Sequence, residues 1–218
     1  MLFRSELFWC ESFRSLPPEY VDTNWLMSLD LHLRSPFNKR IKRLLDLGLS
    51  FCGIIVLSPI LLLASVAVVL ESGFPLFFNQ TRSGFMGNPY TLHKIRTMNK
   101  KAESSGPQWA DKQDNRITRV GKFLRKWRID EIPQLWNIMK GDMSVVGPRP
   151  ERPEFDRILS REIPHWECRS LVKPGLTGWA QIRSQYASDE ESSREKLAHD
   201  LYYIRSEEHT SELQSPDH

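Results

Sequence analysis

The sequence predicts an α+β fold, mostly helical with short strands, which is attached to a membrane by one kinked apolar helix. An uncharged run of 24 residues extends from Leu47 to Leu70. Two short strand-like segments follow it, between Pro75 and Met98. The later segments with regular apolar spacing have the period of helices. Together these features describe a small mixed domain that follows a membrane-associated helix.

The composition is that of a globular protein with a membrane segment. The chain has 218 residues, of which 40% are hydrophobic and 26% are charged, and this length suits one domain with a small appendage. A net charge of +3 lacks the strong basic character of nucleic-acid binders, so no nucleic-acid partner is expected. The cysteines Cys10, Cys52 and Cys168 match no metal-ligand spacing and indicate a reduced, cytosol-facing protein.

The apolar run is long enough to cross a bilayer at about 1.5 Å per residue. Pro59 stands near its middle and removes a backbone donor, so we expect the helix to bend there, while the Ser58 hydroxyl can satisfy a freed carbonyl. Lys and Arg flank the run on both sides, and both flanks therefore favour the cytosolic side. The residues alone leave open a straight span and a helix that enters one leaflet and returns, with a buried core helix as the weaker alternative.

The remaining elements are predicted from apolar spacing and from Pro and Gly. Val120, Leu124 and Trp127 fall on one face of a helix. Three further helices are predicted: Pro133–Lys140, which Gly141 ends, Pro153–Glu162 and Ser192–Ile204. The segment Lys173–Ile182, before the last of them, is rich in turn residues.

Both ends of the chain look foreign to this pattern. Residues 6–38 have scattered aromatic residues and prolines without a period, as in a linker remnant. Leu2–Ser5 and Arg205–His218 match the translation of common sequencing adapters, and we expect them not to belong to the native protein. The predicted organisation is a linker remnant at 1–37, a basic flank and membrane helix at 38–72, a cytosolic catalytic domain at 73–204 and an artefactual tail at 205–218.

Asp130 and Glu131 are adjacent carboxylates directly before a predicted helix that begins at Pro133. The positive end of the helix dipole is expected to favour their ionised forms. An ionised Asp can attack phosphorus, and an ionised Glu can hold Mg²⁺ through oxygen. An ordinary helix cap would use the same residues, so the pair alone does not decide between cap and catalytic site.

Three cations strengthen the catalytic interpretation. Arg149 stands between two prolines in "GPRP", which restricts its backbone and suits a bidentate phosphate clamp; a surface turn is the alternative. Lys94 and Arg96 alternate in a predicted strand and should point to one face. Near a membrane segment they suggest a diphosphate or a phospholipid headgroup, with a solvated strand edge as the alternative.

From about Asn38 to Ile204 the chain resembles the bacterial sugar transferases, the monotopic phosphoglycosyl transferases, and most of all their exopolysaccharide polyprenyl glycosylphosphotransferase branch. The motifs that carry this resemblance are long and ordered: "KRIKRLLDLGLS", the Ser58–Pro59 break, "PLFFNQTRSGFMGNPYTLHKIRTM", "RITRVGKFLRKWRIDEIPQLWNIMKGDMSVVGPRPERPEF" and "LVKPGLTGWAQI".

The resemblance implies a re-entrant helix with its break at Ser58–Pro59, and an enzyme in the bacterial inner membrane whose catalytic domain faces the cytosol. Asp130 would be the nucleophile, with Glu131 beside it and Mg²⁺ held by both. It would attack the β-phosphate of a UDP-sugar, release UMP and pass the phosphosugar to polyprenyl phosphate. Arg125 and Arg149 correspond to phosphate-contacting positions. Downstream glycosyltransferases would be possible partners.

Lys94 lies in the matching strand motif, and Arg96 is expected to join it in substrate binding. Members of this branch usually extend further upstream and continue past "DLYYIR" into another apolar helix, so we expect the chain to be part of a longer protein. The alternative function is a catalytically silent membrane scaffold of a polysaccharide assembly complex, in which Asp130 and Glu131 act only as a cap. A two-carboxylate glycosidase fits poorly, because its acids stand about 5 Å or more apart on opposite sides of the sugar.

Overall fold

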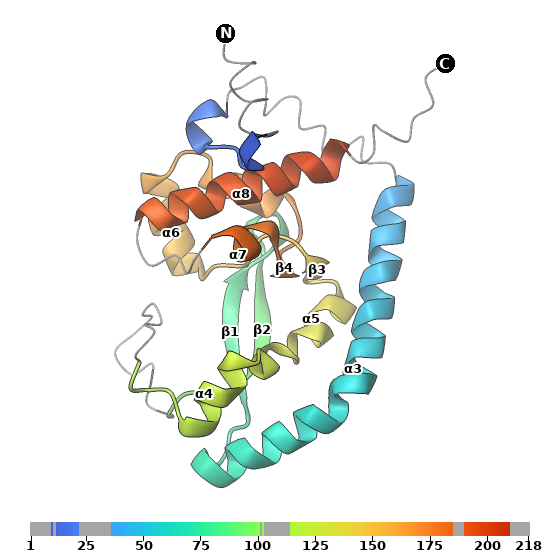
Figure 1. The fold of residues 1–218 in the computed structure, drawn as a ribbon, viewed down its shortest axis with the longest axis vertical. Helices are drawn as coiled ribbons and strands as arrows, with labels where there is room; N and C mark the ends of the chain where they lie inside the picture. Colours follow the sequence, from blue (N-terminus) through green and yellow to red (C-terminus); the bar gives the residue numbers. More distant parts are fainter. Residues whose placement is uncertain are drawn as a thin grey trace. The chain divides into compact units, whose positions relative to one another are not determined.

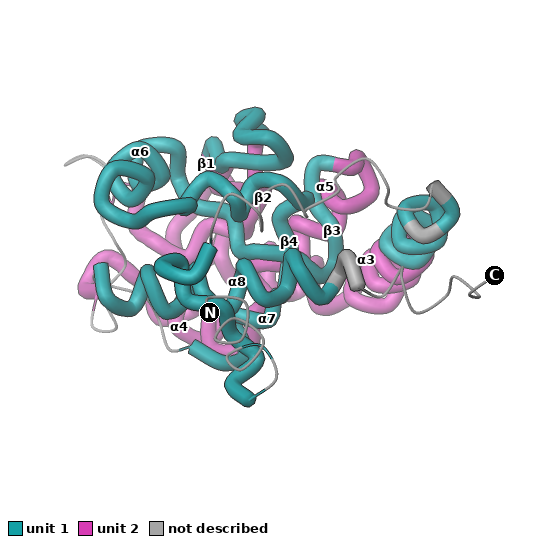
Figure 2. Tube along the Cα trace, turned by 90° about the horizontal axis from the view of Figure 1, so that it is seen from above, with its two compact units in different colours: residues 1–46, 81–90, 142–218 teal, residues 47–80, 91–141 magenta. Residues whose placement is uncertain are grey.

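The computed structural model describes residues 10, 12–21, 36–100, 102, 114–184 and 190–209. The predicted adapter-derived residues 2–5, most of the predicted linker and residues 210–218 therefore lie outside the described residues. Clustering of contacts divides the chain into two compact units (Figure 2). Unit 1 consists of residues 1–46, 81–90 and 142–218, and unit 2 consists of residues 47–80 and 91–141.

The longest element is helix α3, which extends from Pro36 to Ser72 and contains the uncharged run. It is long and apolar enough to cross a membrane, and most of its apolar side chains are exposed. The helix continues through Pro59 and changes direction part-way along its length (Figure 1). The Ser58 hydroxyl donates to the carbonyl of Ile55 at 2.8 Å, one turn back, as expected beside a proline. A long apolar helix with an internal proline is thus confirmed.

Helix α3 ends where Gly73 adopts a left-handed conformation with φ of 67°. Its N–H donates to the carbonyl of Val69 at 2.9 Å, which closes the last turn. A residue with a Cβ atom would be strained there, so glycine suits this stop. The chain then enters a hairpin of β1 (Phe77–Ser83) and β2 (Pro89–Ile95), whose turn contains the 3-10 segment η2 (Phe85–Gly87). The predicted pair of strands is confirmed.

Unit 2 contains α4 (Arg119–Lys126), the 3-10 turn η3 (Ile129–Glu131) and α5 (Gln134–Lys140). Its core consists of Ala64, Val68, Ile95 and Leu124, with Leu61, Leu76, Val120 and Ile129 packed against it. The Thr118 hydroxyl caps α4 by accepting from the N–H of Gly121 at 2.9 Å. Gly141, with φ of 97°, ends α5 as predicted.

The predicted apolar face of α4 holds only in part. Leu124 is buried and Val120 packs against the core, but Trp127 is exposed. Trp127 is the C-cap of α4, where its N–H still donates to the Phe123 carbonyl at 3.2 Å, but its side chain does not reach the core. It lies beside Phe123 instead, with ring centroids 6.5 Å apart.

Unit 1 contains the short parallel pair β3 (Ser144–Val146) and β4 (Gly175–Thr177) and three helices: α6 (Pro153–Glu162), α7 (Trp179–Arg183) and α8 (Glu190–His209). Helix α8 contacts α7 and the 3-10 segment η4 (Trp166–Leu171) (Figure 1). Leu197, Leu201 and Ile204 of α8 are buried at helical spacing in its core. The predicted α6 and α8 are confirmed, and α8 continues past residue 204 to His209.

The segment before α3 contributes to this core, although its sequence reads as a linker. Leu16 is fully buried, and its N–H donates to the carbonyl of Ala198 in α8 at 2.8 Å. Trp179 donates through its indole N–H to the carbonyl of Arg14 at 2.8 Å. Cys10 and Val21 are buried in the same cluster. The described part of this segment is therefore part of the packing of unit 1.

Candidate active site

The adjacent carboxylates lie in η3, between α4 and α5. Arg128, immediately before η3, adopts a left-handed conformation with φ of 57°, which turns the chain sharply out of α4. Asp130 is 6% exposed and Glu131 is 7% exposed. Two adjacent acidic side chains are thus withdrawn from solvent in a tight turn, which is costly unless something offsets their charge.

Glu131 has cationic partners. The Lys94 ammonium, from β2, lies 3.5 Å from Glu131 Oε1, and the Arg128 guanidinium lies 3.3 Å from the same oxygen. Asp130 differs, because its Oδ1 is buried and has no hydrogen-bond partner within the described part of the chain. An acceptor of this kind is able to accept a further donor or a cation.

Burial raises the pKa of Asp130 above its usual value, and the neighbouring Glu131 raises it further, whereas Lys94 and Arg125 act in the opposite direction. The expectation that the helix end would favour the ionised form is therefore wrong for Asp130. Burial of the Asp130 carboxyl is the largest cause of the rise in its pKa.

Arg125 belongs to the same group through α4. Its Nε donates to the Thr97 hydroxyl at 2.9 Å, which fixes the guanidinium near the end of β2. Arg125 and Lys94 both act on the pKa of Asp130, so both cations lie within electrostatic range of it. Unit 2 therefore brings together four of the predicted site residues: Asp130, Glu131, Lys94 and Arg125.

The pair of carboxylates fits a hard divalent cation. No cluster of three or more His, Cys, Asp or Glu that could hold a metal ion occurs among the described residues. Mg²⁺ suits two carboxylates, because it usually keeps several waters and takes its other ligands from substrate phosphates. Asp130, through its unpartnered oxygen, and Glu131, through its carboxylate, are the residues that would hold Mg²⁺.

Arg96 is not brought to this group. Its NH2 donates to the Ser72 carbonyl at 3.1 Å, to the Ser72 hydroxyl at 2.8 Å and to the Gly73 carbonyl. It follows the last residue of β2 and is buried at the C-terminal end of α3. There it satisfies carbonyls that the helix leaves unpaired. The sequence pattern did not reveal this contact, because Arg96 and Ser72 are far apart in the chain.

Arg149 lies in unit 1, in a loop whose backbone is held at three successive residues. The guanidinium of Arg169 donates to the Arg149 carbonyl at 2.8 Å. Arg82 donates to the Pro150 carbonyl at 3.1 Å, and the Ser83 N–H donates to the Glu151 carbonyl at 3.0 Å. The loop is therefore fixed by hydrogen bonds in addition to its prolines.

The side chains that support this loop were not identified from the sequence. Glu151 forms ion pairs with Lys196 of α8 and with Arg82 of β1. Arg169 forms a buried ion pair with Asp200, at 2.7 Å. Lys196 and Asp200 are four residues apart and share one face of α8. Their spacing is the only local signal that could have indicated them, and such spacing is common in solvated helices.

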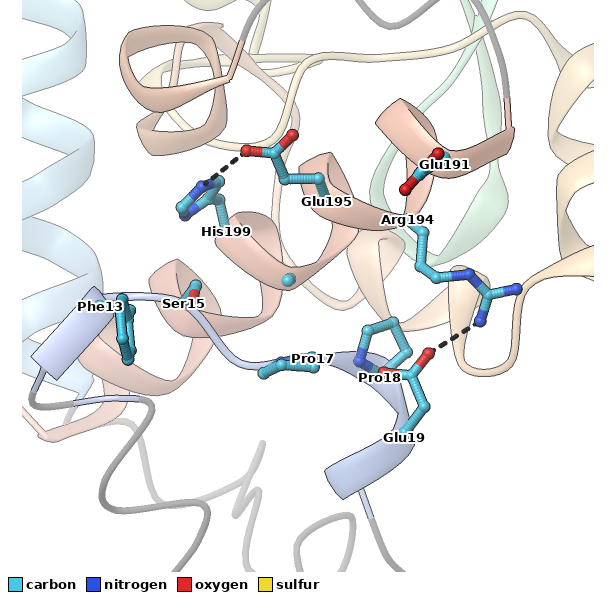
Figure 3. Close-up of a pocket in the computed structure, with 10 residues that line it drawn as sticks. Phe13, Ser15, Pro17, Pro18, Glu19, Glu191, Arg194, Glu195 and His199 are labelled. Atoms are coloured by element: carbon cyan, nitrogen blue, oxygen red, sulfur yellow. Dashed lines mark hydrogen bonds and ion pairs between the residues drawn. The ribbon is translucent and has the colours of Figure 1, made fainter.

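A pocket of about 440 Å³ lies elsewhere in unit 1, between the N-terminal segment and α8 (Figure 3). Two pairs of its charged side chains lie close together: Arg194 contacts Glu19 at 2.8 Å, and His199 lies 4.0 Å from Glu195. None of the predicted site residues lines it. The pocket is therefore separate from the candidate site.

Comparisons with known proteins agree with the sequence motifs. The profile of the family described as "Bacterial sugar transferase" matches residues 37–214. An Aeromonas hydrophila protein, a UDP-N-acetylgalactosamine-undecaprenyl-phosphate N-acetylgalactosaminephosphotransferase, is 43% identical over 187 residues, covering 86% of this chain and 44% of that protein. A UDP-glucose:undecaprenyl-phosphate glucose-1-phosphate transferase of Caulobacter vibrioides is 42% identical over 166 residues, covering 75% of this chain and 62% of that protein. The chain thus spans less than two thirds of each of these relatives.

Proposed function

Because the chain belongs to the bacterial sugar transferase family, we propose that it transfers a sugar 1-phosphate from a UDP-sugar to undecaprenyl phosphate, as an early membrane step in the synthesis of exopolysaccharide or another glycoconjugate. The two relatives are named for different sugars, so the proposal concerns UDP-sugars as a class. The observation that carries it is the buried Asp130 oxygen without a partner, beside Glu131 and within range of Lys94 and Arg125.

We propose a reaction in two displacements at one phosphorus atom. Asp130 attacks the β-phosphorus of the UDP-sugar, an aspartyl O–P bond forms, the bond to the bridging oxygen breaks and UMP leaves. An oxygen of undecaprenyl phosphate then attacks the same phosphorus, which restores the Asp130 carboxylate and gives the lipid diphosphate sugar. Each displacement conserves charge and requires no oxidant or reductant.

The cations of the site suit this chemistry. Lys94 is placed against Glu131 and Arg125 is fixed on Thr97, so both offer positive charge at defined positions to an incoming diphosphate. Bound Mg²⁺, held by Asp130 and Glu131, would offset negative charge on the phosphates. Arg149, on its fixed loop, is the further phosphate-binding residue of this proposal.

We also propose that α3 is re-entrant, with both ends on the cytosolic side. Near its N-terminal end Asp46 is buried and accepts from the Val145 N–H at 2.9 Å in unit 1. At its other end the Ser72 carbonyl accepts from Arg96 in unit 2. Pro59 inside the apolar run and the basic residues on both of its flanks support a helix that returns to the side from which it entered.

The test of the reaction uses the full chain in detergent or vesicles with UDP-sugar, undecaprenyl phosphate and Mg²⁺. We expect UMP release and, without the lipid, an intact mass that increases by one phosphosugar. Asp130→Asn should lower turnover by about 10³-fold or more and remove the adduct. Glu154→Gln, an exposed acid of α6, serves as the control and should behave as wild type. Equal UMP release by Asp130→Asn would exclude this nucleophile and favour a silent scaffold.

A further inference from the structure

Asn137 is a fully buried polar residue of α5, and both the nitrogen and the oxygen of its side-chain amide bond to strand β2. Its Nδ2 donates to the Thr91 carbonyl at 2.7 Å. Its Oδ1 accepts from the His93 N–H at 3.2 Å. A buried amide with donor and acceptor both directed to one strand is a specific connection between α5 and β2, since a buried donor or acceptor left unpaired would destabilise the fold.

The geometry of this contact is that of a parallel β ladder. In such a ladder, one residue donates to the carbonyl of one partner residue and accepts from the N–H of the partner two positions later. Thr91 and His93 are two positions apart, so their groups point to the same edge of β2. Among the described elements, β2 pairs with one strand, β1. The Asn137 side chain thus takes the place of one strand residue beside β2.

The two elements that it joins carry opposite sides of the candidate site. Lys94 follows His93 directly in β2, and Asp130 and Glu131 stand in the turn that leads into α5. The Lys94 ammonium reaches Glu131 Oε1 at 3.5 Å. A shift of α5 along β2 would change this distance, because the two side chains belong to different elements.

We propose that Asn137 is a positioning residue that fixes α5 on β2 and thereby holds the Lys94 ammonium in place against the carboxylates of Asp130 and Glu131. Asn137 does not touch the reacting atoms in this arrangement and acts through the position of Lys94. The catalytic consequence rests on the proposed function, but the contact between α5 and β2 does not.

The main variant is Asn137→Leu, which keeps the approximate volume and removes both hydrogen bonds. Misplacement of a catalytic group by about 1 Å can cost about 100-fold in rate, so we expect kcat to fall about 10- to 100-fold, with KM for the UDP-sugar changed less than about threefold. Gln134→Leu is the matched control. Gln134 is a buried amide of the same helix, and its Nε2 has no hydrogen-bond partner within the described residues. The Gln134→Leu variant should retain the wild-type kcat within about threefold.

Two further measurements distinguish positioning from a general loss of folding. Hydrogen exchange at the His93 amide should be at least about tenfold faster in Asn137→Leu than in wild type and unchanged in Gln134→Leu. In a double-mutant cycle, Asn137→Leu should add little to the loss caused by Lys94→Met, because Asn137 acts through Lys94. If Asn137→Leu does not fold, Asn137→Gln is used in its place, since it keeps the amide but moves it by one methylene.

Unchanged exchange at His93 would overturn the contact itself. Faster exchange with unchanged kcat, or additive losses with Lys94→Met, would overturn the positioning role. A wild-type chain without UMP release would instead overturn the proposed function, and the exchange measurement would still decide whether Asn137 fixes α5 on β2.

Discussion

Two largely buried carboxylates, Asp130 in unit 2 and Glu151 in unit 1, have pKa values displaced in opposite directions. Burial raises both. For Glu151, however, the cations Lys196, Arg169 and Arg82 outweigh burial and bring the pKa down to about 2. For Asp130 burial dominates, the adjacent Glu131 adds to it, and Lys94 and Arg125 offset only part.

The difference lies in the number and closeness of the partners. Glu151 is held by Lys196 and Arg82 and is part of a network that fixes a loop. Asp130 retains a buried oxygen without a partner in the described chain. A carboxylate that is fully paired contributes to stability, whereas one that is buried and incompletely paired costs stability and is available for chemistry. The comparison therefore separates a carboxylate with a structural role from the one that we propose as the nucleophile.

The largest expected effect is a loss of stability when the ion pairs of Glu151 are broken. Lys196→Met leaves Glu151 mostly buried without its closest cation, and removal of one partner of such a pair costs about 3–5 kcal/mol. The free energy of unfolding from urea titration measures this. Arg194→Met is the control on the same helix, because its ion pairs with Glu19 and Glu190 are exposed and should contribute less than about 1 kcal/mol. Equal losses in the two variants would show that burial does not govern the Glu151 network.

The second prediction concerns pH. Glu151 has a folded-state pKa of about 2 against an ordinary value of 4.5, so its ionised form stabilises the folded state. This contribution, roughly 3 kcal/mol, is complete above about pH 4.5 and disappears as the pH falls through about 2. The stability difference between wild type and Glu151→Gln should therefore shrink as the pH is lowered from 6 to 2. A difference that stays constant over this range would contradict the assignment.

Local sequence signals were sufficient for much of the fold. The uncharged run predicted α3, and Pro153 and Gly141 marked the start of α6 and the end of α5. These features depend on residues next to one another in the chain. The adjacent Asp130 and Glu131 were identified for the same reason.

Contacts between distant residues could not be predicted in this way. Glu151 meets Lys196 across 45 positions, Asn137 meets Thr91 across 46, and Leu16 packs against a helix at the other end of the chain. No periodicity or spacing encodes such pairs. The sign of the Asp130 pKa displacement was missed for the same reason, since burial in unit 2 results from packing rather than from the helix that follows.

The third prediction tests whether the incompletely paired site accepts a cation. Mg²⁺ at ten times its dissociation constant should raise the free energy of unfolding of the wild type by about 1.4 kcal/mol. Asp130→Asn should lose this response and, without Mg²⁺, should be more stable than wild type by about 1 kcal/mol, because a poorly solvated charge is removed. Urea titrations with Mg²⁺ and with NaCl at matched ionic strength measure both effects. An equal response to Mg²⁺ in the two proteins would place the ion elsewhere.

The smallest expected effect on stability is that of Lys94→Met, the counterpart of Lys196→Met in the other unit. Lys94 is partly exposed and lies 3.5 Å from Glu131, and Arg128 remains 3.3 Å from the same oxygen, so the loss should be below about 1 kcal/mol. Turnover should nevertheless fall at least about tenfold, because in the proposed reaction the Lys94 ammonium stabilises the charge of the diphosphate. Lys196 would then matter mainly for stability and Lys94 mainly for activity. A loss of several kcal/mol from Lys94→Met, with turnover retained, would place Lys94 among the structural partners and remove the contrast between the two sites.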